Sequence, residues 1–211
     1  MSTPTQPPSA RRSRPRHAAL LLAVSGVVLA LGTPPRASGA PPAETALEQA
    51  VKAAFVYNFV KLVTWPDSPL TRAPTLSICV LDDDPLADAL DTTVRDKRLM
   101  GRPLAVGRFS RIDEVVPCAV LFVGRGMSGR LPQILVQLRG QSVLTVSDAE
   151  GFTAQGGMIG LFVEDHRVRF EVGAATAQAA GLQISSKLLR LSRPAPSPPC
   201  SSCTVPSASE R

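Results

Sequence analysis

Apolar residues recur every three or four positions from Leu47 to Leu62, which is the period of one face of a helix. The spacing predicts an amphipathic helix as the first element of the folded chain. Thr45 followed by Glu48 fits a capping box at its start. Trp65-Pro66 is expected to end it, because proline disfavours helical backbone at the preceding residue.

Short apolar segments then alternate with helical ones through the middle of the chain. Strands are expected at 75–81, 102–108, 118–123 and 142–146, and helices after Asp84-Pro85, near Ile112 and at 131–138. Strands that alternate with helices usually pair in parallel. The expected fold is therefore an α/β three-layer sandwich, a mostly parallel sheet with helices on both faces.

The pattern changes in the last part of the chain. Two apolar segments, 157–163 and 167–172, flank the short Asp165-His166 connection, which is typical of an antiparallel hairpin. We expect this hairpin at the edge of the sheet. A final helical stretch follows at 174–191, with an interruption at Gly181.

The amino terminus has the order of a secretory signal peptide. An arginine-rich stretch without acidic residues precedes an apolar run at 18–31, and small residues follow at 37–40. That run is shorter than the roughly 20 residues of a membrane-spanning helix. We therefore expect residues 1–40 to be a signal peptide, residues 44–192 to form one periplasmic α/β domain, and the Pro-, Ser- and Cys-rich residues 193–211 to be a disordered tail.

Removal of that segment changes the charge of the protein. The full chain carries a net charge of +6, but residues 1–43 hold five basic residues and no acidic one. The remaining chain has 18 basic and 17 acidic residues, a net charge of +1. A nucleic-acid partner, which would need a basic face, is not expected.

Four cysteines are present, and two of them fall in expected strands. Cys79 and Cys118 lie in the first and third strands, which are commonly neighbours in a doubly wound sheet. An oxidising compartment makes them disulfide candidates, and two buried free thiols are the alternative. Cys200 and Cys203 lie in the tail, where a local or intermolecular disulfide is a better interpretation than a redox or zinc site.

Candidate catalytic residues are few. His166 is the one histidine outside the signal segment, and its place in a turn argues against a catalytic triad or a histidine-rich metal site. Asp82 to Asp84 follow the first strand, where α/β enzymes often hold Mg²⁺, but a solvated cluster at a helix start explains them equally well. We expect no metal, no cofactor and no enzymatic activity.

A glycine motif offers a second alternative. Gly124, Gly126 and Gly129 have the G-x-G-x-x-G spacing of a dinucleotide site, with Asp148 about twenty residues further on. The motif follows the third strand of the unit instead of the first, and exported proteins rarely meet free dinucleotides. A flexible loop is the preferred interpretation.

Several segments, taken together, resemble the YfiR family. They are Val51–Val60 with Thr64-Trp65-Pro66, Ser77–Leu81, Gly156–Leu161 with Val168–Val172, and Gly181–Leu189. The resemblance implies a periplasmic repressor that binds the sensor domain of an inner-membrane diguanylate cyclase of the YfiN kind and keeps cyclic di-GMP low, and biofilm formation with it. It also implies a disulfide at the positions of Cys79 and Cys118. A second cysteine pair of some members would fall near Thr153 and Gly160, and this sequence lacks it.

The expected partner surface lies on the hairpin. Strand alternation places Arg167, Arg169 and Glu171 on one face, and we predict that Arg169, Glu171 and nearby Ile159 contact the partner. Tyr57 and Trp65 are expected to pack on the first helix, with a partner contact as the alternative. The rival functions are an exported small-ligand-binding or hydrolytic α/β protein and an accessory to a membrane histidine kinase, and a homodimer is a further alternative for the assembly.

Overall fold

The computed structural model describes residues 43–66, 72–82, 84–115 and 117–194. The helices are α1 (Ala43–Leu62), α3 (Leu86–Val94), α4 (Leu131–Gln137), α5 (Ala174–Ala179) and α6 (Ser186–Leu191), with 3-10 turns η1 (Ile112–Glu114) and η2 (Arg125–Arg130). The strands are β1 (Val63–Thr64), β2 (Leu76–Leu81), β3 (Arg98–Leu99), β4 (Arg102–Phe109), β5 (Val120–Val123), β6 (Leu144–Ser147), β7 (Ile159–Glu164), β8 (Arg167–Val172), β9 (Gln183–Ile184) and β10 (Arg193–Pro194). The expected signal peptide, and all of the expected tail beyond Pro194, lie outside the described residues.

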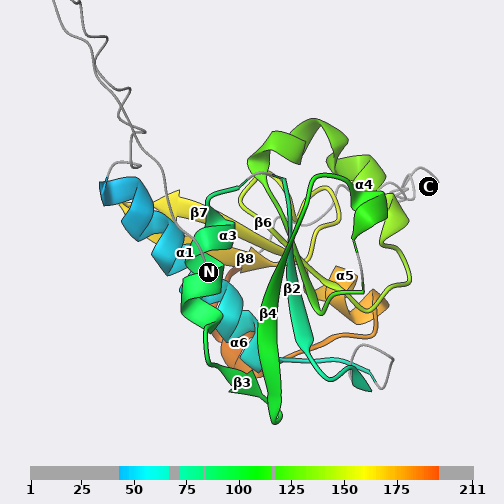
Figure 1. The fold of residues 1–211 in the computed structure, drawn as a ribbon. Helices are drawn as coiled ribbons and strands as arrows, with labels where there is room; N and C mark the ends of the chain where they lie inside the picture. The colour runs from blue at the N-terminus through cyan, green and yellow to red at the C-terminus, as the bar shows by residue number, and fades with distance from the viewer. Residues whose placement is uncertain (1–42, 67–71, 83, 116, 195–211) are drawn as a thin grey trace, which may run out of the picture. The chain divides into compact units, whose positions relative to one another are not determined.

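One sheet organises the described chain (Figure 1). Its strand order is β10-β8-β7-β6-β5-β2-β4-β3. Strands β4, β2, β5, β6 and β7 run parallel, and β8 and β3 pair antiparallel at the two sides. Because β4 and β5 flank β2, the chain winds outward in both directions from its first long strand. The predicted α/β fold with a mostly parallel sheet is confirmed.

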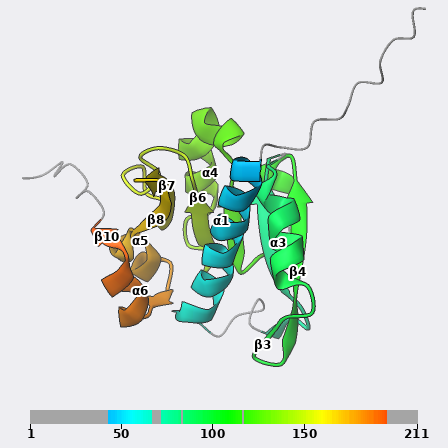
Figure 2. The same cartoon turned by 90° about the vertical axis from the view of Figure 1, so that its left-hand side faces the viewer.

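The sheet separates two apolar clusters, because successive side chains of a strand point to opposite faces. Ile78 and Val80 of β2 pack in the larger cluster with α1 and α3. Cys79 and Leu81 pack in the other with α4 and η1. Figure 2 shows α1 and α3 side by side over one face of the sheet. Helices on both faces give the three layers that the alternating pattern predicts.

Helix α1 differs from its prediction at both ends. It already includes Ala43, so Thr45 lies inside the helix and the expected capping box is wrong. It ends at Leu62, three residues before Trp65, because the chain leaves the helix to form β1. Strand β1 pairs antiparallel with β9, which joins the end of α1 to the C-terminal segment.

The predicted hairpin is present, and β7 pairs with β8 from Ile159↔Val172 to Glu164↔Arg167. Asp165 and His166 both have positive φ, 50° and 57°. Two such residues in succession make the turn type whose twist matches that of paired strands. The two-residue strand β10 covers part of the outer edge of β8, so the described fold extends two residues past the expected boundary at Ser192.

The C-terminal helical stretch breaks where glycine allows it. Gly181 has a φ of +77°, which ends the α5 segment, and β9 follows before α6 begins. The Ser185 hydroxyl accepts the backbone N–H of Leu188 at 3.3 Å and caps α6. No helix in the described part of the chain has the length and apolar character that a membrane crossing requires.

The disulfide between Cys79 and Cys118 is confirmed. The two Cα atoms are 6.0 Å apart, and both residues are buried. Cys79 lies within β2, and Cys118 lies two residues before β5, the parallel neighbour of β2. The bond therefore joins adjacent strands and closes a segment of 39 residues that contains α3 and β4.

Replacing both cysteines by alanine should lower the free energy of unfolding by about 4 kcal/mol, because the unfolded chain regains the entropy of an open loop of this length. Urea denaturation of the oxidised protein and of Cys79→Ala/Cys118→Ala measures the difference. Wild type treated with a reductant is the matched control and should unfold close to the variant. Equal midpoints for the variant and the oxidised wild type would contradict the prediction.

Candidate functional site

The carboxyl ends of the parallel strands bring together the loops that the sequence offered as a metal site or a dinucleotide site. Asp82 and Asp84 follow β2, Gly124 to Gly126 follow β5, and Asp148 follows β6. This edge, next to the central strand from which the chain winds both ways, is where doubly wound folds usually bind ligands. The side chains at this edge therefore decide whether it is a binding site or a structural cluster.

The glycine loop is filled by carboxylates. A Cβ at Gly124 would lie 2.9 Å from Cβ of Asp82 and 3.0 Å from Oδ2 of Asp84, and a Cβ at Gly126 would overlap the Asp82 carboxylate. A 3-10 turn follows the loop in place of the α-helix whose N-terminus holds a pyrophosphate. These glycines make room for aspartates, which would repel a phosphate. The geometry does not support the dinucleotide alternative.

A buried lysine provides the positive charge of this edge. Lys52 projects from α1 and is 1% exposed. Its Nζ lies 2.5 Å from Asp148 Oδ2 and 2.6 Å from Glu48 Oε1. Lysine is almost never fully buried without a charged partner, since the cost of desolvating an ammonium group is high. The ion pair of Lys52 with Asp148 therefore holds α1 against the loop after β6.

Asp148 is held by a second cation at the surface. Arg125 Nε lies 3.1 Å from Asp148 Oδ2 and 3.2 Å from the backbone oxygen of the same residue. The other carboxylate oxygen, Oδ1, is buried and has no hydrogen-bond partner among the described residues. Both cations thus act on one oxygen. Lys52 closes the edge from inside and the exposed Arg125 side chain covers it from outside.

Asp84 has an altered acidity in this environment. Burial raises the pKa of its carboxyl above the ordinary value, and the nearby Asp148 and Asp82 carboxylates act in the same direction. The backbone N–H of Leu86, which donates to Asp84 Oδ1 at 2.8 Å, and the Lys52 charge oppose the shift. Among the described residues, no group of three or more acidic, histidine or cysteine side chains has a metal-binding arrangement. Asp83 lies outside the described residues.

The hairpin residues expected at a partner surface do not share one environment. Arg169 is exposed, and its Nε lies 2.9 Å from Glu164 Oε2. Glu171 is 6% exposed; its carboxylate accepts the Thr153 hydroxyl and lies 3.3 Å from an Arg193 nitrogen. Arg169 is thus the expected partner residue of β8 that solvent reaches freely.

The expectation that Ile159 lies at the surface is wrong. Ile159 has no exposed area and packs in the larger apolar cluster with Leu161. Strand β7 has β6 on one side and β8 on the other. Ile159 is therefore not on an edge strand, and its side chain faces the core. The expectation for Glu171 is corrected as well, because the Thr153 hydroxyl and the Arg193 side chain cover its carboxylate.

The positions of the absent second cysteine pair are neighbours in space. A Cβ at Gly160 would lie 3.5 Å from Cγ2 of Thr153. At this place the chain instead has the hydrogen bond from Thr153 to Glu171. A polar contact between the same segments therefore stands where a second disulfide would lie.

Tyr57 and Trp65 are half-buried and pack against the larger apolar cluster. Trp65 Nε1 donates to the backbone oxygen of Ala119 at 3.2 Å. The ammonium groups of Lys61 and Lys97 lie 5.3 and 5.6 Å from the centre of the Tyr57 ring. Packing accounts for both aromatic residues, as the sequence predicted, and a partner contact by either one stays a prediction.

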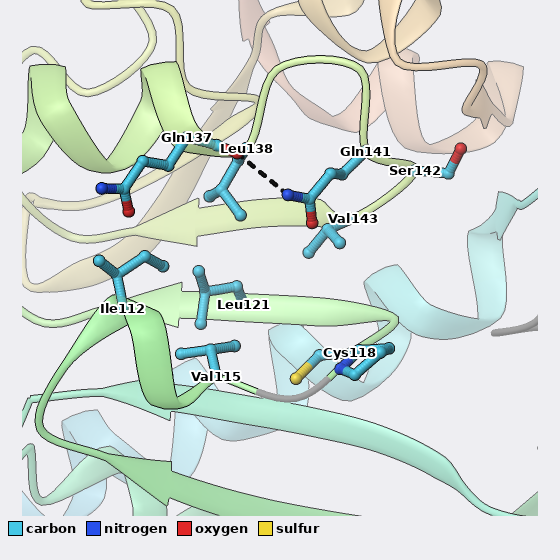
Figure 3. Close-up of a pocket in the computed structure, with 10 residues that line it drawn as sticks. Ile112, Val115, Cys118, Leu121, Gln137, Leu138, Gln141, Ser142 and Val143 are labelled. Carbon is cyan, nitrogen blue, oxygen red and sulfur yellow. Dashed lines mark hydrogen bonds between the residues drawn. The ribbon is translucent and has the colours of Figure 1, made fainter.

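A small pocket of about 220 Å³ lies beside the disulfide (Figure 3). Ile112, Val115, Leu121 and Val143 give it apolar walls, and Cys118 lies at its base. The side-chain amide of Gln141 donates to the backbone oxygen of Gln137 at 3.0 Å along its rim. This rim is satisfied internally, so the pocket offers few polar groups that could orient a ligand.

Over the described residues, the fold and the carboxyl edge define a doubly wound α/β domain with one cystine and a buried lysine–carboxylate pair. A sequence model of the YfiR/HmsC-like family matches residues 49–193. The chain belongs to that family. A comparison with curated proteins gives no significant match.

Among solved structures, the chain is similar to a conserved domain protein from Vibrio cholerae O1 biovar El Tor str. N16961. The two sequences are 8% identical and the TM-score is 0.48. The likeness covers 69% of this chain and 59% of that one, less than two thirds of its length.

Lys52→Met should lower the free energy of unfolding by about 3–5 kcal/mol, because it leaves Asp148 buried without its ammonium partner. The double variant Lys52→Met/Asp148→Leu removes both charges and should regain most of that loss. Lys61→Met, on the exposed face of the same helix, is the control and should change stability little. Chemical denaturation measures all four proteins, and a single variant as stable as wild type would refute a structural role for the pair.

Asp84→Asn should stabilise the protein at neutral pH. A raised pKa means that the folded state holds the Asp84 proton more tightly than the unfolded chain, so stability is lost as pH rises through the folded pKa. Asparagine keeps an oxygen for the Leu86 N–H and cannot ionise. The unfolding midpoint, followed from acid to neutral pH, should exceed that of wild type at neutral pH and converge with it in acid.

Asp113 is the matched contrast for this pH series, because a hydrogen bond from Arg111 lowers its pKa. A lowered pKa stabilises the fold above the pKa of the unfolded chain and loses that effect as pH falls. Asp113→Asn should therefore be slightly less stable than wild type at neutral pH and equal to it in acid. A stability change in the same direction for both variants at neutral pH would show that burial does not control the pKa of Asp84.

Proposed function

We propose that this protein is a periplasmic regulator that binds the periplasmic domain of an inner-membrane diguanylate cyclase and holds the enzyme inactive. The observation that carries the proposal is the match to the YfiR/HmsC-like family over residues 49–193, essentially the whole described domain. That family suggests regulators of cyclic di-GMP signalling, a regulatory role without catalysis.

The carboxyl edge of the sheet supports a binding role better than a catalytic one. The loops that would hold a substrate in an α/β enzyme are filled by Asp82 and Asp84, and Asp148 beside them is paired with Lys52. Catalytic sites aim preorganised groups at a substrate, so a lysine already committed to two carboxylates is poorly placed for that task. The protein would then act through its surface.

A periplasmic location is consistent with two observations. The family is periplasmic, and the cystine fits an oxidising compartment. The disulfide fixes β2 against the start of β5 and lies within the smaller apolar cluster. A covalent link between two central strands rigidifies the domain, which suits a protein that inhibits a partner by contact.

Arg169 is the hairpin residue with which the proposal is tested. The test is a pull-down with the periplasmic domain of a membrane cyclase encoded near this protein. Arg169→Glu should weaken binding at least about tenfold, because the reversed charge would face the partner's groups that the arginine contacts in the proposed complex. Arg190→Glu, an equal charge change on exposed α6, is the matched control and should bind normally.

The same variants separate binding from regulation in cells. Cyclic di-GMP should rise on deletion of the gene, return to its low level with wild type or Arg190→Glu, and stay high with Arg169→Glu. Absence of binding by wild type, together with unchanged cyclic di-GMP on deletion, would overturn the proposed function. Normal repression by Arg169→Glu would move the partner surface away from the hairpin.

A further inference from the structure

A larger cavity lies between α4 and α5 and shares Leu138 with the pocket beside the cystine. Its volume of about 510 Å³ falls within the range of roughly 300–1,000 Å³ that is usual for small-molecule sites. Leu135, Leu138 and Met158 form one part of the wall, and Ala175 and Ala179 form the part on α5. The interior therefore suits an apolar ligand.

The sequence leaves this space empty for local reasons. Helix α5 presents alanines, whose side chains are too short to reach α4. Helix α4 is seven residues long, and Gly140, with a φ of +76°, turns the chain away soon after its end. The gap is thus set by the backbone path and by small side chains, and a larger residue on α5 would fill it.

A single positive charge stands at the mouth of this cavity. Arg139 lines it, is exposed, and has no ion pair or side-chain hydrogen bond among the described residues. None of the described residues that line the cavity is acidic. Five other exposed or half-exposed arginines, at 108, 111, 125, 169 and 193, are paired with carboxylates. Arg139 is therefore free to bind an anion.

One buried polar group lies deeper in the same cavity. Thr145 is 2% exposed, and its hydroxyl oxygen accepts the backbone N–H of Met158 at 3.1 Å. A hydroxyl that accepts one hydrogen bond can still donate its own hydrogen. The cavity thus combines apolar walls and one cation at the rim with three neutral polar side chains, those of Thr145, Gln155 and Thr176.

From these features we propose that the cavity between α4 and α5 binds a free small amphiphile with an apolar chain and one anionic head, of the medium-chain carboxylate class. The chain would lie against Leu135, Leu138 and Met158, and the head would pair with Arg139. A cationic head would be repelled by Arg139, and a polyphosphate would find one basic group where it needs several. This ligand site goes beyond the proposed partner, and its failure would leave that proposal standing.

Calorimetric titration of the mature chain with decanoate, kept below its micelle concentration, tests the site. Decanoate should bind, decanol should bind more weakly, and decyltrimethylammonium should bind least. Arg139→Gln should weaken decanoate binding about fivefold, the scale of an exposed ion pair. Arg190→Gln, which removes an arginine far from the cavity, should leave it unchanged.

Filling the cavity gives the second arm of the test. Ala179→Phe should weaken decanoate binding more than about tenfold by occupying the apolar space, whereas Ala50→Phe, the same change on the exposed face of α1, should have no effect. Ala175→Phe repeats the test from the next turn of α5 if Ala179→Phe does not fold. Equal binding of the cationic amphiphile, no effect of either cavity variant, or adsorption to anionic vesicles without decanoate binding would each overturn the inference.

Discussion

The ion pair between Lys52 and Asp148 is the constraint on which the arrangement of this domain depends. It is buried, and it joins residues 96 positions apart in the sequence, one on α1 and one after β6. A charge in this place is tolerated because its opposite is in contact with it, so neither group can move alone. Helix α1 is thereby fixed over the sheet, and Phe55 and Phe59 meet Phe170 of β8 at the side of the sheet where the hairpin lies.

The same pair determines what the carboxyl edge can do. In many doubly wound proteins this edge is open and binds a ligand. Here the lysine ammonium and the Arg125 guanidinium neutralise the carboxylate after β6, and the Asp82 and Asp84 side chains occupy the space that Gly124 and Gly126 leave. The cations, Lys52 and Arg125, and the anion, Asp148, all belong to this chain. The centre of the usual binding edge is buried with Lys52 and Asp148. The surfaces left for binding are the pocket beside Arg125, the hairpin and the cavity between α4 and α5.

Patterns of short range predicted most of this fold. The apolar segment of β2, the alternation along β8 and the glycine at 181 each carry their own local signal, and the cystine followed from two cysteines in strands that such sheets place side by side. The role of Lys52 could not be predicted in this way. In the sequence it is four residues from Glu48, a spacing typical of an exposed ion pair, and only the tertiary fold brings Asp148 to it. Ile159 was misplaced for a related reason: β7 pairs with β6 as well as β8, and this tertiary packing buries Ile159 in the larger apolar cluster.

The cystine and the ion pair lie at different ends of the central strands, and this separation has a consequence for regulation. Cys118 precedes β5, whereas Asp148 follows β6 and faces the opposite edge of the sheet. Loss of the disulfide loosens the segment containing α3 and β4, while loss of the ion pair releases α1 and, through Phe55 and Phe59, the underside of the hairpin. For the docking surface proposed on the hairpin, the ion pair is therefore the nearer of the two links, because α1 contacts Phe170 of β8. Where a second disulfide would lie, this chain has the hydrogen bond from Thr153 to Glu171. Because Glu171 is in β8, this polar contact lies closer to the hairpin surface than the cystine does.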